Sequence, residues 1–310
     1  TVTGFYAGRT HDIIANTDCA LGVEQNQEIL ETILSFMEQY QMEPYDEKTG
    51  KGLLRHVLIR YGFTTKEIMV CLVINAKKIP HCEKLVELLQ KIEGMTSITI
   101  SVNQKNTNVI MGDSYEVLWG QAFITDYIGE IKYQISPLSF FQVNPVQTEI
   151  LYQTAIDYAG LTGKETVIDA YCGIGTIGLI AAKKAGKVIG VELNKDAVKD
   201  ARINAKENKI TNAAFYQGDA GRFMVEMAAK GEKADVVFMD PPRAGSDERF
   251  LSSVVKLSPK KVIYISCNPE TLARDLKYLT KHHYKVEKIQ PVDMFPFCNH
   301  CETVCELVRK

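Results

Sequence analysis

The second half of the chain alternates short apolar segments with helical patterns, and this alternation restricts the possible folds more than any other feature. The apolar segments lie at 166–170, 187–192, 213–219, 234–240 and 261–267. Strands that are apolar along their whole length are typical of a parallel sheet covered on both faces. We therefore expect a doubly wound α/β domain with a Rossmann-like, mostly parallel sheet, in which ligands bind at the carboxyl ends of the strands.

The first 134 residues follow a different pattern. Apolar residues at helical spacing predict helices over about 24–40 and 81–92. Strands are predicted at 53–61, 67–75, 97–103, 107–112, 115–119 and 122–134. Their order resembles a split βαβ layer, and nothing in it suggests catalysis. We expect a smaller central α+β domain over 1–134, followed by a catalytic domain over 135–310.

Composition excludes several classes of protein. Of the 310 residues, 45% are hydrophobic and 24% charged, which rules out collagenous, mucin-like and intrinsically disordered chains. No apolar run approaches the roughly 18 residues that span a bilayer, and the first residues lack the features of a signal peptide. We expect the 8 cysteines to be reduced thiols of a cytoplasmic protein with no membrane partner. The chain lacks an initiator Met, so we expect a fragment of a longer protein.

Charge is divided unevenly along the chain, although the net charge is only −2. Residues 1–134 hold 12 basic and 17 acidic side chains, whereas residues 135–310 hold 24 basic and 21 acidic ones. A polyanion would therefore bind more favourably to the second half.

A glycine-rich loop, DAYCGIGTIG at 169–178, follows the first apolar segment. Gly173, Gly175 and Gly178 have the spacing of a dinucleotide-binding fingerprint, which would indicate an NAD-dependent oxidoreductase. The same loop suits S-adenosylmethionine, which carries no phosphate, because no basic residue lies near it. A third interpretation is a tight strand-to-helix turn that binds no ligand.

Two acidic residues end the next two segments. Glu192 lies 19 residues after Gly173, where a carboxylate can accept hydrogen bonds from the ribose hydroxyls of an adenosyl group. Asp219 can accept from an adenine amino group, or it can be the N-cap of a helix over 220–229. Glu192 and the glycine-rich loop together indicate an adenosyl cofactor without deciding which one.

Asp240 ends the fourth segment in the sequence Asp-Pro-Pro-Arg. Two prolines make a rigid extended loop, which presents Asp240 at the edge of the sheet. Similar tetrapeptides in enzymes that methylate base amino groups carry an aromatic residue in fourth place. Arg243 occupies that place here, which favours another methyl acceptor. The alternative is a plain turn.

Cys267 ends the fifth segment in the sequence Ser-Cys-Asn-Pro. Asn268 is predicted to be a helix N-cap, with Pro269 at the first helical position. The positive end of the helix dipole would favour a thiolate at Cys267. The alternative is a buried small residue at a strand end.

The segment before the last strand, which is predicted at about 303–308, holds side chains with the chemistry of metal ligands: Cys298, His300, Cys301 and Cys305. We reject a metal site there because the neighbours Val304 and Leu307 are typical of a core. Glu302 is a lone acid in this apolar run, and an acid so placed can have a raised pKa and transfer protons.

Ser139 to Asn144 reads SFFQVN at the junction of the two halves. Adjacent aromatic residues beside an amide, here Phe140, Phe141 and Gln142, can stack on and recognise a planar base. They are equally typical of core at a domain boundary.

Taken together, a reactive cysteine, an isolated carboxylate and an adenosyl loop suit one reaction well. Carbon 5 of uracil is too poor a nucleophile to accept a methyl group directly. A thiolate that adds to carbon 6 makes carbon 5 nucleophilic, and a base must then remove the carbon 5 proton. Cys267, S-adenosylmethionine and Glu302 would supply the nucleophile, the methyl donor and the base.

The segments FFQVN, DAYCGIG, DPPRAG, SCNP and MFPFCNHCE occur in the order seen in RNA uracil-C5 methyltransferases, which the chain resembles over nearly its whole length. The bacterial 23S rRNA type is the most similar, and a tRNA enzyme of the same family is the alternative. The resemblance implies a class I methyltransferase fold, Cys267 as nucleophile and Glu302 as base, with S-adenosylhomocysteine as product. Family members flip the target uridine out of the RNA.

The resemblance also implies binding residues. It places Gln142, Tyr171, Glu192 and Asp240 around the cofactor and target base, Gly173 and Gly175 in the cofactor loop, Asp219 near the adenine, and Phe140 and Arg243 beside the pocket. We expect RNA, 23S rRNA above all, as the partner of a monomer without an obligatory protein partner. A non-catalytic RNA-binding module is a further alternative.

Two features depart from the family pattern. Cys298 stands where the family usually has Thr. Family members of the rRNA type also carry an N-terminal OB-like (TRAM) domain and often an iron–sulfur cluster, both upstream of this chain. Cys19 lies where the last cluster ligand usually falls, and one cysteine cannot hold a cluster. We therefore expect no metal in this chain, and an iron–sulfur cluster only in a full-length protein.

Overall fold

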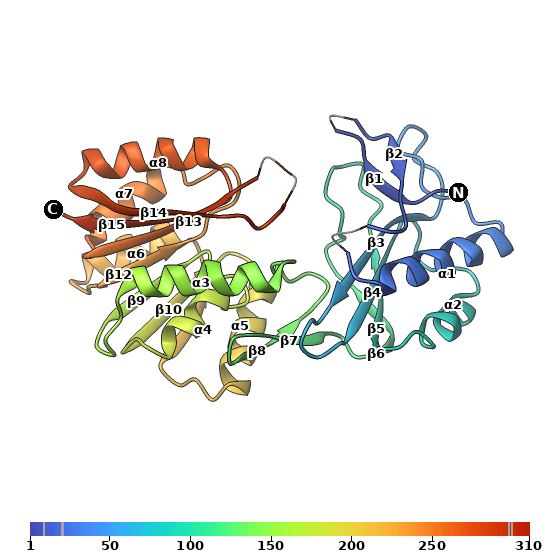
Figure 1. The fold of residues 1–310 in the computed structure, drawn as a ribbon, viewed down its shortest axis with the longest axis horizontal. Coiled ribbons are helices and arrows are strands. Elements are labelled where there is room, and N and C mark those ends of the chain that lie inside the picture. The colour runs from blue at the N-terminus through green and yellow to red at the C-terminus, as the bar shows by residue number, and fades with distance from the viewer. Residues whose placement is uncertain (9, 20–21, 297, 299) are drawn as a thin grey trace. The chain divides into compact units, whose positions relative to one another are not determined.

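A computed structural model describes residues 1–8, 10–19, 22–296, 298 and 300–310. The chain divides into two compact units (Figure 1). Unit 1 comprises Thr1–Asp126 and Gln134–Leu138, and unit 2 comprises Tyr127–Tyr133 and Ser139–Lys310. The boundary predicted after residue 134 falls within a hairpin of two strands, β7 (Ile124–Ile128) and β8 (Ile131–Ile135), whose residues are shared between the units.

Unit 1 is built on a four-stranded sheet in the order β3-β4-β5-β6. Its elements are β1 (Gly4–Tyr6), β2 (Ile13–Ala15), α1 (Gln25–Gln39), β3 (Leu54–Tyr61), β4 (Ile68–Ile74), α2 (Cys82–Leu89), β5 (Met95–Val102) and β6 (Glu116–Gly120). Strands β4 and β5 are parallel, with α2 in the connection between them, and the other neighbours in this sheet are antiparallel. Helices α1 and α2 share one apolar core with the sheet, which includes Ile29, Phe36 and Leu72.

The strand predicted at 107–112 is wrong, because this segment is a loop. The Asn103 side chain donates hydrogen bonds to the carbonyls of Val109 and Ile110 at 2.7 and 3.0 Å. These side-chain bonds satisfy backbone groups that a strand would pair within a sheet. The strand predicted at 122–134 is in fact the hairpin β7–β8, which turns at Gly129 with φ +55°.

Unit 2 contains a seven-stranded sheet in the order β11-β10-β9-β12-β13-β15-β14. The strands are β9 (Thr166–Ala170), β10 (Lys187–Glu192), β11 (Ala213–Gln217), β12 (Val236–Met239), β13 (Lys261–Ser266), β14 (Tyr284–Val292) and β15 (Glu302–Arg309). Strands β9 to β13 are parallel, and β15 runs antiparallel to β13 and β14. The predicted doubly wound, mostly parallel sheet is confirmed.

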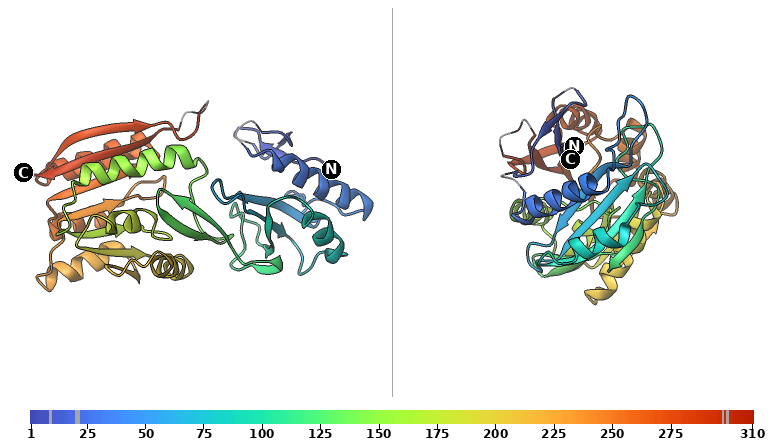
Figure 2. Two further views of the ribbon diagram at one scale, coloured as in Figure 1. Left: turned by 60° about the horizontal axis from the view of Figure 1, so that its bottom comes forward. Right: turned by 90° about the vertical axis from the view of Figure 1, so that its right-hand side faces the viewer.

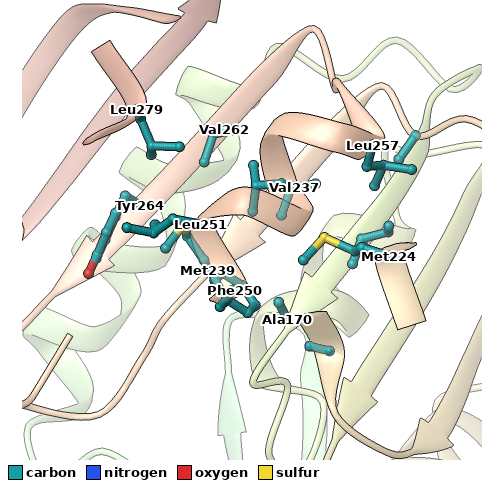
Figure 3. Close-up of a cluster of buried hydrophobic side chains, with 14 of the residues drawn as sticks. Ala170, Met224, Val237, Met239, Phe250, Leu251, Leu257, Val262, Tyr264 and Leu279 are labelled. Carbon is teal, nitrogen blue, oxygen red and sulfur yellow. The ribbon is translucent and has the colours of Figure 1, made fainter. Parts of the chain in front are cut away.

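Helices cover both faces of this sheet (Figures 1 and 2). Helices α3 (Pro145–Ala159), α4 (Thr176–Ala182) and α5 (Lys195–Glu207) pack against one face, and α6 (Ala220–Ala229), α7 (Glu248–Leu257) and α8 (Pro269–Lys281) against the other. Figure 3 shows the core on the second face, where Val237 and Met239 of β12 meet Leu251 of α7. Burial of each such side chain stabilises the fold by about 1.5–3 kcal/mol.

The chain changes direction in the sheet between β9 and β12. The connection after β9 leads to β10 on one side, and β12 lies on the other side of β9. In open α/β sheets the crevice at such a switch point, outside the carboxyl ends of the strands, is where ligands bind.

In the described part of the chain, none of the helices is long and apolar enough to cross a membrane.

Candidate active site

The predicted site residues of unit 2 come together at the carboxyl edge of the sheet. Strands β9 to β13 end there, and β15 begins there because it runs in the opposite direction. The residues at or just beyond these strand ends are Tyr171, Glu192, Asp219, Asp240, Cys267 and Glu302. Positions far apart in the sequence therefore share one edge.

Strand pairing places Cys267 and Glu302 as neighbours. The last pair of the antiparallel ladder between β13 and β15 is Ser266 with Thr303. Cys267 follows Ser266 and Glu302 precedes Thr303, so these two residues are neighbours one position beyond the last pair. Glu302 is nearly buried, with 5% of the residue's surface exposed, whereas Cys267 is half-buried.

The pKa of the Cys267 thiol is raised, and not lowered as the helix dipole alone would suggest. Helix α8 does begin at Pro269 with Asn268 as its N-cap, as predicted. However, burial raises the pKa of the Cys267 thiol, and the nearby charges of Glu302 and Asp240 raise it further. The positive charge of Arg243 lowers this pKa, but it is outweighed.

Two carboxyl groups beside the thiol are also shifted. Burial raises the pKa of Asp240 to about 8, with further contributions from the charges of Glu302 and Asp169. Burial likewise raises the pKa of Glu302, as predicted for this lone acid, and its part in proton transfer stays a prediction. Carboxyl groups whose pKa is raised by burial are suited to acid–base chemistry.

The glycine-rich loop between β9 and α4 is held by two carboxylates. Glu192 Oε2 accepts a hydrogen bond from the Gly173 amide at 3.2 Å, and Oε1 accepts one from the Asn194 amide at 2.8 Å. Beneath the loop, Asp169 Oδ2 accepts from the Gly178 amide at 2.8 Å. Asp169 is buried, which raises its pKa to about 7. Sequence analysis assigned no role to Asp169, although an acid within an apolar strand was the available signal.

The backbone of this loop adopts left-handed conformations, which are rare for residues other than glycine. Tyr171, Gly173 and Gly175 have φ of +63°, +53° and +85°. A Cβ on Gly175 would lie 2.9 Å from the Phe215 ring, so only glycine fits there. A Cβ on Gly173 would have no protein atom within 4 Å. The loop therefore leaves open space at Gly173.

Asp219 is the N-cap of α6, as one of its two interpretations predicted. Its Oδ1 accepts a hydrogen bond from the Arg222 amide at 2.7 Å. This bond uses one of the two carboxylate oxygens.

The segment Ser139–Asn144 presents its two aromatic residues differently. The Phe140 side chain is 71% exposed, whereas the Phe141 ring packs against Tyr133 with 6.0 Å between ring centroids. Gln142 forms a hydrogen bond with the buried hydroxyl of Tyr152 on α3. The core interpretation therefore describes Phe141, and Phe140 is free to meet a ligand.

Asn144 connects this segment to the residues before Glu302. Its Oδ1 accepts from the Gln147 amide at 3.2 Å and caps α3, and its Nδ2 donates to the Met294 carbonyl at 3.2 Å. The sequence does not predict this connection, because a single Asn gives no signal for a partner 150 residues away.

Arg243 is exposed beside the same edge, and its guanidinium contacts the ring of His300. Cys298 Sγ lies 2.9 Å from the Phe295 carbonyl, so the thiol makes the kind of local contact that a Thr hydroxyl could make.

Phe297 and Asn299 of the MFPFCNHCE segment lie outside the described residues. Within the described ranges, no group of three or more His, Cys, Asp or Glu side chains could hold a metal ion. Cys19 is a half-buried free cysteine, and its role as a cluster ligand stays a prediction.

Comparisons with known sequences identify the family. Residues 21–310 match the family model of tRNA (uracil-5-)-methyltransferases. An uncharacterized RNA methyltransferase from Caldanaerobacter subterraneus is 45% identical over 309 residues, which cover 99% of this chain and 68% of that protein. One from Clostridium tetani is 47% identical over 302 residues, covering 97% and 66%. The chain thus spans about two thirds of the length of these relatives.

Solved structures agree with these matches. The tRNA (uracil-54, C5)-methyltransferase of Pyrococcus abyssi, in complex with S-adenosyl-L-homocysteine, superposes with a TM-score of 0.81 and 31% identity over 98% of this chain and 72% of that one. The tRNA m1G37 methyltransferase of M. jannaschii shares the fold alone, with a TM-score of 0.54 and 14% identity over 90% and 78% of the two chains. The predicted class I methyltransferase fold and the family resemblance are both confirmed. The chain belongs to the tRNA (uracil-5-)-methyltransferase family.

Proposed function

We propose that this chain transfers a methyl group from S-adenosylmethionine to carbon 5 of a uridine in RNA. One observation carries the proposal above the others: the register of β13 and β15 makes a cysteine and a nearly buried acid neighbours at the ligand edge of the sheet. Family membership supports it, because the chain matches the uracil-5 methyltransferase family over residues 21–310.

The glycine-rich loop fits an adenosyl cofactor. The open space at Gly173 is large enough for a Cβ, so the backbone can approach a ligand there. Glu192 binds the Gly173 amide beside that space, and we expect it to accept hydrogen bonds from the ribose hydroxyls. We assign Tyr171, Gly175 and Asp219 to further contacts with the cofactor, and Gln142 and Asp240 to contacts with both the cofactor and the base. When bound, S-adenosylmethionine supplies an electrophilic methyl group.

The Cys267 thiol first gives its proton to water, and the resulting thiolate begins the reaction by adding its sulfur to carbon 6 of the uracil. The electron pair of the ring double bond then makes carbon 5 nucleophilic, and carbon 5 would take the methyl group while S-adenosylhomocysteine leaves. Glu302 removes the proton from carbon 5, the double bond forms again, and the bond between Cys267 and carbon 6 breaks. The raised pKa of Glu302 suits this step, because a stronger base accepts the proton more readily.

The RNA would be held by exposed groups at the same edge. Phe140 is exposed enough to stack on a base that has left the RNA stack. The positive charge of the Arg243 guanidinium acts on Cys267, and we assign Arg243 to a contact with the nucleotide. Gln142 and Asp240 offer hydrogen-bonding groups to the uracil edge.

We assign 23S rRNA as the substrate on the motif set, and tRNA is the second candidate because the Pyrococcus abyssi relative is a tRNA enzyme. The test is tritium release from 5-tritiated uridine in unmethylated 23S rRNA and tRNA, compared side by side. Release from neither RNA would overturn the proposal, and release from tRNA alone would replace the first substrate by the second.

Separate measurements test the mechanism and the remaining alternatives. RNA with 5-fluorouridine at the target should trap a covalent complex, because fluorine cannot leave as a proton does. Full turnover by Cys267→Ala would exclude the covalent route. Calorimetric binding of NAD(H) but not of S-adenosylhomocysteine would favour an oxidoreductase. Methyl transfer would exclude a purely RNA-binding module.

A further inference from the structure

A buried carboxylate on α8 has no part in the chemistry proposed above. Asp275 has none of its surface exposed. A buried charge is tolerated only when hydrogen bonds and an opposite charge replace its water. The partners of Asp275 therefore show what it holds in place.

Those partners converge on the loop that follows Asp240. Asp275 Oδ2 accepts hydrogen bonds from the Ser246 amide at 2.8 Å and from the Tyr264 hydroxyl at 2.7 Å. Its Oδ1 accepts from Arg274 Nε at 2.8 Å. Tyr264 lies on β13 with its ring in the core (Figure 3). One carboxylate thus joins a loop, a strand and a neighbouring guanidinium.

Arg274 also binds this loop. We call the hydrogen bonds that Asp275 and Arg274 make with the loop and with Tyr264 the grip. Its Nη2 donates to the carbonyls of Ala244 and Ser246 at 3.0 and 2.9 Å. Gly245 passes so close that a Cβ on it would lie 2.6 Å from Arg274 Nη2 and 2.8 Å from Asp275 Oδ2.

The start of α8 holds the loop from the other side. Asn268 Nδ2 and Thr271 Oγ1 donate to the Arg243 carbonyl at 3.3 and 3.4 Å. Cys267 directly precedes Asn268, the N-cap of this helix. The helix that follows the nucleophile therefore also binds the backbone of Arg243 to Ser246 along its length.

We propose that Asp275 and Arg274 are positioning residues, which hold the segment from Asp240 to Ser246 against α8 so that Asp240 and Arg243 keep their places beside Cys267. This inference rests on the proposed uridine methylation. Displacement of a reacting or orienting group by about 1 Å can slow an enzyme 100-fold. Loss of the grip therefore slows attack by Cys267 while leaving the anchors at Gly173, on the far side of the switch point, in place.

The test compares two variants of the grip with a matched control. Asp275→Asn keeps the shape but turns a donor toward Arg274. Arg274→Lys keeps the charge but loses the planar fork that reaches both the carboxylate and the carbonyls. The control is Asp235→Asn, because Asp235 also binds a backbone amide, that of Thr166, and a cation, Lys260, but at the opposite edge of the sheet.

The readouts are the rate of covalent trapping by 5-fluorouridine RNA at saturating RNA and cofactor, and the affinity for S-adenosylhomocysteine. We expect at least a 10-fold slower rate for Asp275→Asn and a 3- to 10-fold slower rate for Arg274→Lys. The affinity should fall less than the rate, because Tyr171 is bonded to Ser246 whereas Gly173 is held separately by Glu192, and Asp235→Asn should trap at the wild-type rate.

Rates within twofold of wild type in both grip variants would overturn the inference. An equal loss in Asp235→Asn would also overturn it, because the effect would then be one of stability. If Asp275→Asn fails to fold, Arg274→Lys and Tyr264→Phe decide, since each removes only part of the grip. A wild-type protein that neither traps nor methylates RNA would refute the proposed function itself.

Discussion

At the scale of single residues, the proposed mechanism separates the roles of the thiol and the acid beside it. Glu302→Gln keeps the shape of the side chain but cannot accept the carbon 5 proton. We expect Cys267 to add and the methyl group to transfer, after which release is slowed about 10²–10⁴-fold. The variant should accumulate a covalent RNA–protein complex that carries the methyl label and survives denaturing electrophoresis.

Cys267→Ala is the control for that experiment, because it has no sulfur to add and should show no such complex. Turnover of Glu302→Gln at the wild-type rate would show that another group takes the proton. A complex that lacks the methyl label would place Glu302 before methyl transfer instead of after it.

The pKa of Asp240 makes a prediction about stability. Its folded value of about 8 lies above the value of about 3.9 expected in the unfolded chain. The stability contributed by the protonated acid is therefore fully present below about pH 4 and is lost as the pH rises to about 8. Asp240→Asn mimics the protonated form at every pH.

We expect thermal unfolding of Asp240→Asn to match the wild type near pH 4 and to occur at a higher temperature near pH 8. The gap should widen steadily between these limits. A gap that is constant with pH would mean that Asp240 is ionised in the folded protein at neutral pH. The same variant should transfer methyl groups poorly, as expected where a functional site reduces stability.

At the scale of elements, the turn between β9 and α4 offers a matched pair of glycines. Gly175→Ala should destabilise the protein strongly, because the new Cβ would collide with the Phe215 ring. Gly173→Ala meets no protein atom within 4 Å, so only its left-handed backbone conformation opposes it, at a cost of about 1–2 kcal/mol. Gly173→Ala should nevertheless lose affinity for S-adenosylhomocysteine, because its Cβ enters the space proposed for the ligand.

Chemical denaturation and calorimetric titration of both variants check this reversal. Gly175→Ala should show the larger drop in the free energy of unfolding, and its folded fraction should retain more affinity than Gly173→Ala. Unchanged affinity in Gly173→Ala would place the cofactor elsewhere.

The elements that could be predicted well from the sequence are those whose hydrophobic pattern has a single interpretation. Strands β9, β10, β12 and β13 are buried along most of their length, so their apolar segments could be predicted without knowledge of the partner. Strand β14 escaped prediction because it lies at the sheet edge and carries Lys285, Glu287 and Lys288, which are typical of a protected edge. The segment 107–112 has strand-like composition, but Asn103 and Ser101 bind its backbone and replace sheet pairing.

The candidate site was predictable to a similar degree. Residues at strand ends were found because parallel strands bring their carboxyl ends to one edge whatever the details. The raised pKa of Cys267 could not be predicted from the sequence, because it depends on the burial of the thiol and on the nearby charges of Glu302 and Asp240. Asp275 was missed for a related reason, because its role lies in partners that only the fold brings together.

At the scale of the whole molecule, the two units have separate apolar cores. One core lies around α1, α2 and the four-stranded sheet, and the other lies between the seven-stranded sheet and helices α6 to α8. The residues proposed for the cofactor all belong to unit 2. Proteins with more than one core often unfold in more than one step, and a ligand stabilises only the part that it binds.

This separation can be measured because the chain has a single tryptophan, Trp119, which packs against the core of unit 1. At 100 times its dissociation constant, S-adenosylhomocysteine adds about 2.7 kcal/mol to the unit that binds it. That should raise the calorimetric transition of unit 2 by roughly 5–10 °C. The midpoint reported by Trp119 fluorescence should not move. An equal shift in both signals would mean that the two units unfold as one, and a shift in Trp119 fluorescence alone would place the cofactor in unit 1.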